Sequence, residues 1–182
     1  MKKDRKNIIL ESLAAMLEEK NMSKITTASL AEKSNITEAA LYRHFPSKRS
    51  IYAELFSFCD DTIFAKCNEL KKEKISAQEK VKKIFIFFML FIEKNKGFAR
   101  LLSREALSSA EQNVSDNVNQ FYERFELVLR QMLKEDEKNL TTQAGISAQL
   151  IITVLEGNIG RYIRSKFKDC LLYTSPSPRD RS

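Results

Sequence analysis

Residues 26–48 read TTASLAEKSNITEAALYRHFPSK, and they carry more structural information than any other part of the sequence. It predicts two short helices joined by a tight turn. Thr26 and Thr37 are favoured N-cap residues, and Ser29 stands at the third position of the first short helix, where a capping box usually has an acid. Asn35 suits the turn between the two helices, because asparagine tolerates the left-handed conformation.

The second short helix, from Glu38 to about Phe45, carries small residues on its first turn and larger polar residues on its last turn. This layout suits a helix whose leading end enters the major groove of DNA, because bulky residues there would hold it away from the base edges. Polar groups near its trailing end then contact phosphates, which position a protein without reading sequence. The expected DNA-binding residues are Thr26, Thr27, Thr37, Glu38, Ala39, Ala40, Tyr42, His44 and Lys48.

Several of these residues also have a purely structural interpretation. Thr26 caps a helix whether or not it contacts a phosphate. Tyr42 can be a packing residue with a solvated hydroxyl, and His44 a solvated surface histidine. A basic arm, residues 2–6, either adds nonspecific attraction to DNA or serves only as a solubilising tail.

The composition indicates a folded, all-α protein. Of 182 residues, 43% are apolar and 30% charged, and there are only four glycines and three prolines to interrupt helices. The net charge of +7 fits a polyanionic partner, although a basic balance alone is weak evidence. The three cysteines form no Cys-x-x-Cys pair, which argues against a zinc site or a disulfide framework.

The sequence argues against an enzyme. His44 is the only histidine, and neither a Gly-rich phosphate loop nor a nucleophile with a plausible base nearby is present. We therefore expect no cofactor and no metal. The N-terminus lacks the apolar core of a signal peptide, and the longest apolar run, Ile84–Ile92, is about half of what spans a bilayer. We expect a cytoplasmic protein that does not contact a membrane.

Helical periodicity organises the rest of the chain. Ser76 and Glu79 form a capping-box pattern before a strongly apolar helix, and Asn95–Gly97 predicts its end. Thr141 or Thr142 is expected to open the last long helix. The expected helices lie at about 4–20, 47–74, 77–94, 98–105, 110–135 and 142–168, besides the two short ones.

These patterns predict an N-terminal three-helix helix-turn-helix domain followed by a helical bundle. We expect the DNA-binding domain at residues 3–63 and the bundle, for dimerisation and partner binding, at 64–168. Residues 169–182 are rich in Pro, Ser and Arg without a period. We expect them to be a disordered tail or non-native sequence.

The residues from Leu41 to Lys48, LYRHFPSK, resemble the DNA-binding domain of the TetR family of regulators. Further segments are similar to the SlmA-like nucleoid occlusion factors: residues 9–18, 37–48, 101–107, 119–126, 129–133 and 161–168. The resemblance covers about residues 5–168. SlmA-like proteins continue beyond this point into a further helical segment, so we expect a truncated chain.

This resemblance implies all-helical homodimers that bind palindromic double-stranded DNA sites and are associated with the nucleoid. While bound, such proteins engage the C-terminal tail of the division protein FtsZ and disrupt its polymers, so that division is blocked over the nucleoid. The tail lies in a groove between the fourth and fifth helices. By position, the resemblance implies that Phe58, Lys66, Phe87, Lys94 and Asn95 line that groove.

The assignment of Lys66 departs from the family pattern, and the assignments of Phe58 and Phe87 leave an alternative open. Lys66 stands where the family usually has arginine, which removes a bidentate fork. Phe58 and Phe87 can equally belong to the bundle core.

Gly157 and Gly160 are small residues three apart, which lets helices approach closely. We assign them to a dimer seam, because a palindromic site calls for a two-fold pair of readers. They can also relieve crowding inside one subunit.

A second function is kept as an alternative: a ligand-responsive transcriptional repressor of the general TetR type. In that case the Phe-rich fifth helix would line a small-molecule pocket instead of a solid core. The sequence offers few polar groups on that face.

Overall fold

The structure is a computed structural model that describes residues 4–19, 25–108 and 111–172. Within those ranges the secondary structure is helical, which confirms the all-α prediction. The chain divides into two compact units. The first unit combines Met1–Lys66 with Asn95–Phe125, and the second combines Cys67–Lys94 with Glu126–Ser182.

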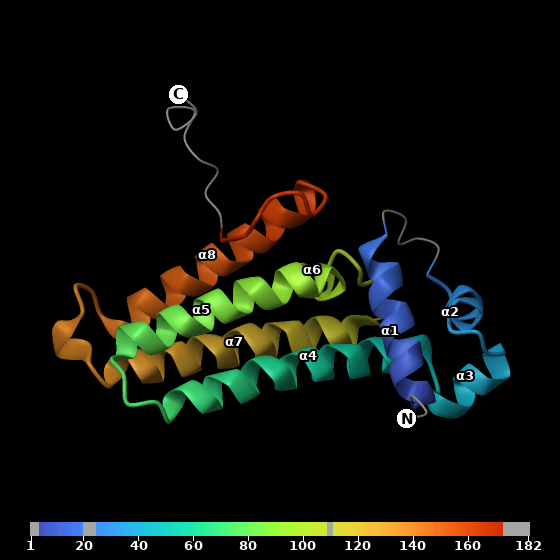
Figure 1. Cartoon of the computed structure of the whole chain (residues 1–182), viewed down its shortest axis with the longest axis horizontal. Coiled ribbons are helices and arrows are strands. Elements are labelled where there is room, and N and C mark those ends of the chain that lie inside the picture. Colours follow the sequence, from blue (N-terminus) through green and yellow to red (C-terminus); the bar gives the residue numbers. More distant parts are fainter. Residues whose placement is uncertain (1–3, 20–24, 109–110, 173–182) are drawn as a thin grey trace. The chain divides into compact units, whose positions relative to one another are not determined.

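The first unit contains the helix-turn-helix. Its elements are α1 (Arg5–Glu18), α2 (Thr27–Lys33), α3 (Glu38–His44), α6 (Lys96–Leu102) and the first parts of α4 (Lys48–Lys71) and α7 (Gln112–Lys134). In Figure 1, α1 is blue, α2 and α3 follow it in paler blue, and α6 lies against α1. Helix α1 contacts α2 and α2 contacts α3, so α3 is held by a succession of packed helices.

The local signals that were predicted to define α2 and α3 are confirmed. Thr26 and Ser29 form a capping box: the Ser29 N–H donates to Thr26 Oγ1 at 3.1 Å, and the Thr26 N–H donates to Ser29 Oγ at 2.9 Å. Thr37 Oγ1 accepts from the Ala40 N–H at 3.2 Å. Asn35 adopts a φ of 54° in the left-handed region.

Helix α4 begins with a second hydroxyl capping box. The Ser50 N–H donates to Ser47 Oγ at 3.2 Å, and the Ser47 N–H donates to Ser50 Oγ at 3.3 Å. Ser47 therefore caps the start of this helix.

Helix α6 differs from the sequence-based expectation. We expected residues 95–97 to separate two helices, with the second helix at about 98–105. The second helix, α6, instead begins at Lys96 and contains Gly97. The physical reason is packing. An ideal Cβ on Gly97 would lie 2.9 Å from the backbone oxygen of Ala14 and 3.1 Å from Cβ of Leu17, so glycine permits a close contact between α6 and α1.

Arg100 on α6 also stabilises the contact between α6 and α1. The side chain is buried, and its guanidinium donates to the backbone oxygen of Leu17 at 2.8 Å and to that of Glu19. These carbonyls lie at the C-terminal end of α1, where backbone acceptors lack helical partners. Arg100 therefore stabilises the end of α1 and ties it to α6.

Aromatic rings fill the core of the first unit. Phe121 on α7 stands edge-on to Phe56 and Phe98, with ring centroids 6.2 Å apart in both pairs. Phe125 stacks on Phe121 at 5.6 Å. Such edge and offset contacts are favourable geometries for aromatic pairs, so this core is closely packed.

The second unit contains α5 (Ala77–Lys94), α8 (Ala144–Arg164), a short 3-10 helix (Glu137–Asn139) and the remaining parts of α4 and α7. Ser76 Oγ accepts from the Glu79 N–H at 3.2 Å, as the capping-box pattern predicted. The apolar face of α5 is buried, as its periodicity predicted, and includes Val81, Ile84, Phe88 and Ile92.

The start of α8 also differs from expectation. Neither Thr141 nor Thr142 opens it, because the helix begins at Ala144. Its N-terminal backbone is instead capped from a distance: Oε1 of Glu137, in the 3-10 helix, accepts from the Ala144 N–H at 3.2 Å. The Glu137 carboxylate therefore caps α8 in place of the threonine hydroxyl that was expected to cap it.

Helix α8 ends at Arg164, before Lys166 and Phe167 take left-handed φ values of 57° and 61°. Leu171 is buried, and its N–H donates to Oε1 of Glu93 at 2.5 Å. The expected tail at 169–182 lies outside the described residues from position 173 onward.

We predict that Gly97→Ala destabilises the protein by about 1–3 kcal/mol, because the new methyl group meets the α1 backbone, which cannot move as a side chain would. Gly145→Ala is the control. There the nearest side-chain atom to an added Cβ is Cδ of Arg130 at 3.6 Å, an ordinary contact. We expect that change to stay within about 1 kcal/mol of neutral. Urea unfolding followed by circular dichroism measures both, and equal stability of the two variants would contradict close α1–α6 packing.

Candidate nucleic-acid interface

Helix α3 presents a small leading turn to solvent. Leu41 is fully buried and Phe45 nearly so, which anchors the inner face of the helix. Glu38 and Ala39 are exposed and Ala40 is half-buried. The side chains on this turn are short apart from Glu38, so a DNA backbone can approach α3 closely.

Tyr42 follows on the same exposed side. Its side chain is 48% exposed, which argues against a role as a buried packing residue. Its hydroxyl donates to Oγ1 of Thr27 on α2 at 3.4 Å, a long contact. The structure therefore brings together two of the expected DNA-binding residues and leaves the Tyr42 hydroxyl accessible.

The other expected residues lie around this face. Thr26 and Thr37 are exposed, and each hydroxyl accepts from an N–H of its own helix. The Thr26 hydroxyl also donates to Ser29 Oγ at 3.1 Å, so it must exchange this bond before it can donate to a phosphate. His44 is half-buried at the end of α3. In the basic arm, Lys6 pairs with Glu54 at 3.6 Å, and Lys2 and Lys3 lie outside the described residues.

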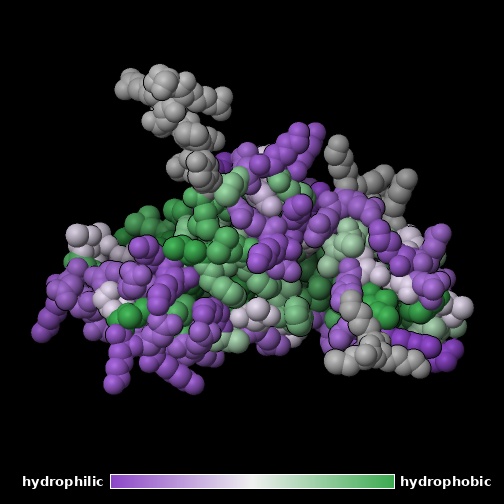
Figure 2. All heavy atoms as spheres, viewed as in Figure 1, coloured by the Kyte–Doolittle hydropathy of each residue, from purple (hydrophilic) through white to green (hydrophobic). Residues whose placement is uncertain are grey.

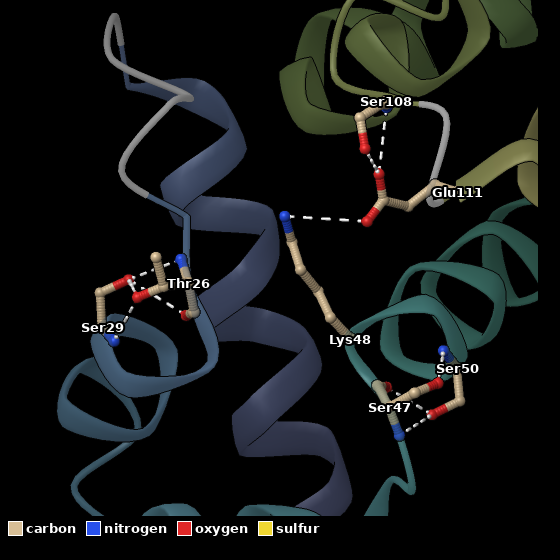
Figure 3. A network of polar contacts seen from close by, with 7 residues as sticks. All are labelled: Thr26, Ser29, Ser47, Lys48, Ser50, Ser108 and Glu111. Carbon is tan, nitrogen blue, oxygen red and sulfur yellow. Dashed lines mark hydrogen bonds and ion pairs between the residues drawn. The ribbon is translucent and has the colours of Figure 1, made fainter.

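Lys48 has a neighbour that sequence reasoning missed. Its Nζ lies 3.8 Å from Oε1 of Glu111 (Figure 3). The same Nζ lies 5.3 Å from the ring centroid of Tyr52. Glu111 is buried, and the Ser108 N–H donates to its other oxygen at 3.0 Å. Burial and the Glu111 carboxylate raise the pKa of Tyr52, so its phenol stays protonated.

A signal for Glu111 was present in the sequence. Ser108 and Glu111 have the Ser-x-x-Glu spacing of a capping box, three residues apart at the start of α7. This spacing predicts the Ser108–Glu111 hydrogen bonds. It says nothing of Lys48, which lies far away in the sequence.

The residues expected to bind the FtsZ tail fall in both units. Phe58 and Asn95 lie in the first unit and line a cavity of about 270 Å³ together with residues of α1 and α4, among them Leu10 and Leu55. Phe58 is 63% exposed, so it does not belong to the core. Lys66 is half-buried on α4.

Phe87 and Lys94 lie on α5 in the second unit. Phe87 is half-buried, with its ring centroid 6.1 Å from that of Phe91. Lys94 is exposed at the last residue of the helix.

Helix α8 carries an exposed apolar stripe. Ile146, Leu150 and Val154 are between 49% and 56% exposed and are spaced four residues apart, on one side of the helix. Figure 2 shows hydrophobic surface over α8 in the same view as Figure 1. Gly157 continues the stripe, and an added Cβ there would meet no described atom within 4 Å. Gly157 therefore does not relieve crowding within the described part of the subunit.

Gly160 lies one turn further on and is half-buried. A Cβ there would lie 3.2 Å from the flexible end of the Arg164 side chain.

Comparison with known families assigns the chain. Residues 9–55 match the family described as bacterial regulatory proteins, tetR family, and residues 76–173 match the SlmA-like family described as tetracyclin repressor-like, C-terminal domain. The second match covers more than half of the chain. The chain belongs to the SlmA family of TetR-type regulators.

Curated members of the SlmA family align with nearly the whole chain. The nucleoid occlusion factor SlmA of Marinomonas sp. (strain MWYL1) is 35% identical over 171 residues, covering 92% of this chain and 87% of that protein. The nucleoid occlusion factor SlmA of Vibrio vulnificus (strain YJ016) is 36% identical over 172 residues, covering 92% and 88%.

Solved structures show the same fold at lower identity. The transcriptional regulator FadR from Bacillus subtilis, in complex with stearoyl-CoA, superposes with a TM-score of 0.74 at 15% identity, covering 91% of this chain and 90% of that one. A TetR transcriptional regulator from Legionella pneumophila gives a TM-score of 0.71 at 21% identity, covering 91% and 90%. In the described ranges, none of the helices is both long and apolar enough to cross a bilayer.

Proposed function

We propose that this protein is a nucleoid occlusion factor: a cytoplasmic, nucleoid-associated homodimer that binds palindromic DNA sites and, while bound, binds FtsZ and disrupts its polymers. Division would thereby be blocked over the nucleoid. The observation that carries this proposal is the 35–36% identity to nucleoid occlusion factors along 92% of the chain.

The DNA-binding part of the proposal is supported by the exposed face of α3. Its short leading side chains suit the major groove, where Thr37 offers a hydroxyl and a methyl group to a base edge. Tyr42 and Lys48 would donate to phosphates on either side of the groove. The net charge of +7 adds nonspecific attraction, so affinity would fall steeply with salt.

We predict that Tyr42→Phe weakens DNA binding by about tenfold to hundredfold, the worth of one hydrogen bond to a charged group. The matched control is Tyr122→Phe, which removes a hydroxyl from a buried tyrosine on α7. Both are measured by fluorescence anisotropy on a duplex selected from chromosomal fragments. Unchanged affinity of Tyr42→Phe, or an equal loss in Tyr122→Phe, would count against the α3 interface. Thermal unfolding checks that both variants fold.

The FtsZ part of the proposal is supported by the chemistry of the five residues given by the family resemblance. An acidic, partly apolar tail peptide calls for apolar contacts together with cations. Phe58 offers an exposed aromatic ring beside a cavity, and Lys94 an exposed cation.

We predict that Lys94→Glu leaves DNA affinity within about twofold of wild type but abolishes the disruption of FtsZ polymers, because a carboxylate there repels an acidic tail. Lys82→Glu reverses the charge of another exposed lysine on α5 and is the control. The assay is sedimentation of FtsZ polymers with and without the selected duplex. Full activity of Lys94→Glu argues against this site.

The same assay separates the alternative function. A ligand-responsive repressor of the general TetR type would leave FtsZ polymers intact whether or not DNA is bound. The buried state of Phe88 on α5 indicates a packed helix face at that position.

The homodimer is supported by the stripe on α8. Three exposed aliphatic side chains in register, followed by the unobstructed Gly157, form a surface that a second copy can cover by two-fold pairing. Two α3 helices related in this way would read the two halves of a palindrome.

We predict that Leu150→Glu converts the dimer to a monomer, because the seam would then bury a charge, and weakens binding to a palindrome by at least about tenfold. Leu127→Glu, at another exposed leucine in the second unit, is the control and should remain dimeric. Light scattering after size exclusion measures the mass. A dimeric Leu150→Glu protein would place the seam elsewhere.

A further inference from the structure

Lys48 is an expected phosphate contact, but in the free protein its ammonium group lies near the carboxylate of Glu111. Figure 3 shows its side chain extending from the start of α4 toward Glu111, with Nζ 3.8 Å from Oε1. Lys48 is the first residue of α4, where the helix dipole is unfavourable for a cation. A nearby carboxylate compensates for this position, and so would a DNA phosphate.

Glu111 is held ready for such a partner. Its side chain is only 4% exposed, and Oε2 accepts from both the N–H and the hydroxyl of Ser108. Oε1 is the oxygen that faces Lys48. The loop before α7 thus fixes the carboxylate in place, and Lys48 contributes the positive charge beside it.

Lys48 is free to leave this pair. Its side chain is 35% exposed, its contact with Glu111 is long, and lysine carries its charge on a flexible stem. Lys48, Tyr52, Ser108 and Glu111 also line a cavity of about 250 Å³. That volume and those polar walls can admit the waters that Glu111 needs once Lys48 has turned away.

We propose that Glu111 competes with DNA phosphate for Lys48 and so lowers the DNA affinity of the free protein. The proposal rests on the proposed DNA binding. When DNA binds, Lys48 exchanges Glu111 for a phosphate, and Glu111 loses its cation while keeping Ser108. The strength of DNA binding is therefore set partly by a residue that itself contacts no DNA.

The exchange has a consequence for the ion balance. In the wild-type protein, a phosphate gains Lys48 while Glu111 is left to recruit a cation from solution. Without the Glu111 charge, the phosphate contact releases counterions from DNA with no such uptake. The slope of log affinity against log salt is then steeper by up to about one.

The test is a double-mutant cycle with Lys48→Met and Glu111→Gln, in which glutamine can still accept from Ser108. DNA affinity is measured by anisotropy across a salt series, on the selected duplex and on a duplex of scrambled sequence. We expect Glu111→Gln to raise affinity about threefold to tenfold at low salt on both duplexes and to steepen the salt slope. Lys48→Met should cost more in the Glu111→Gln background than in the wild-type background.

Glu105→Gln is the matched control, because it removes the same charge from the same loop. Glu105 pairs with Nε of Arg100 at 3.8 Å and not with Lys48. We expect it to change affinity by less than about twofold. An equal rise for both variants would reduce the effect to general charge removal and overturn the proposal.

Two further outcomes overturn it as well. A loss of affinity in Glu111→Gln would mean that Glu111 orients Lys48 for DNA. No interaction between the two substitutions would mean that they act independently. A wild-type protein that binds neither duplex would instead refute the proposed DNA binding. The same four proteins are also unfolded in urea without DNA. If Lys48 and Glu111 are paired in the free protein, the effects of their substitutions on the free energy of unfolding must also be non-additive.

Discussion

The docking of α6 against α1 is the contact on which the DNA-binding unit depends. Gly97 lets the two backbones meet, and Arg100 supplies donors to the carbonyls at the end of α1. Helix α1 in turn contacts α2, and α2 contacts α3. The helix that supports α2 and α3 is therefore held in part by a buried arginine and a glycine, neither of which belongs to the helix-turn-helix motif.

Two kinds of exposed surface remain once these helices are packed, and they differ in chemistry. The α3 face is small and polar, as a groove-reading surface must be, with Tyr42 at its edge. The α8 stripe and Phe58 are apolar and exposed. Exposing such groups costs free energy in a lone subunit, and that cost is recovered only when a partner covers them. Under the proposed function, the α3 face would bind DNA and the apolar surfaces would bind protein partners.

The sequence predicted the parts of the fold that depend on short-range interactions. Thr26, Thr37 and Asn35 act within three or four residues of themselves, so their roles follow from spacing alone. Gly97 was read as a helix breaker, because its contact with α1 lies some eighty residues away in the chain. Glu111 was missed as a partner of Lys48 for the same reason, although its local bond with Ser108 was foreseeable.

The capping boxes of α2 and α4 differ in charge from the capping pattern that precedes α5. The boxes that begin α2 and α4 are built from hydroxyls alone, Thr26 with Ser29 and Ser47 with Ser50. The pattern before α5 uses Glu79 at the equivalent position. A glutamate at that position favours an isolated helix. In the proposed DNA complex, where Glu38 already brings one carboxylate to α3, a further glutamate at the start of α2 or α4 would add to the repulsion of the polyanion. The neutral hydroxyl caps stabilise these two helices in the free protein, and they carry no negative charge that would repel a phosphodiester chain.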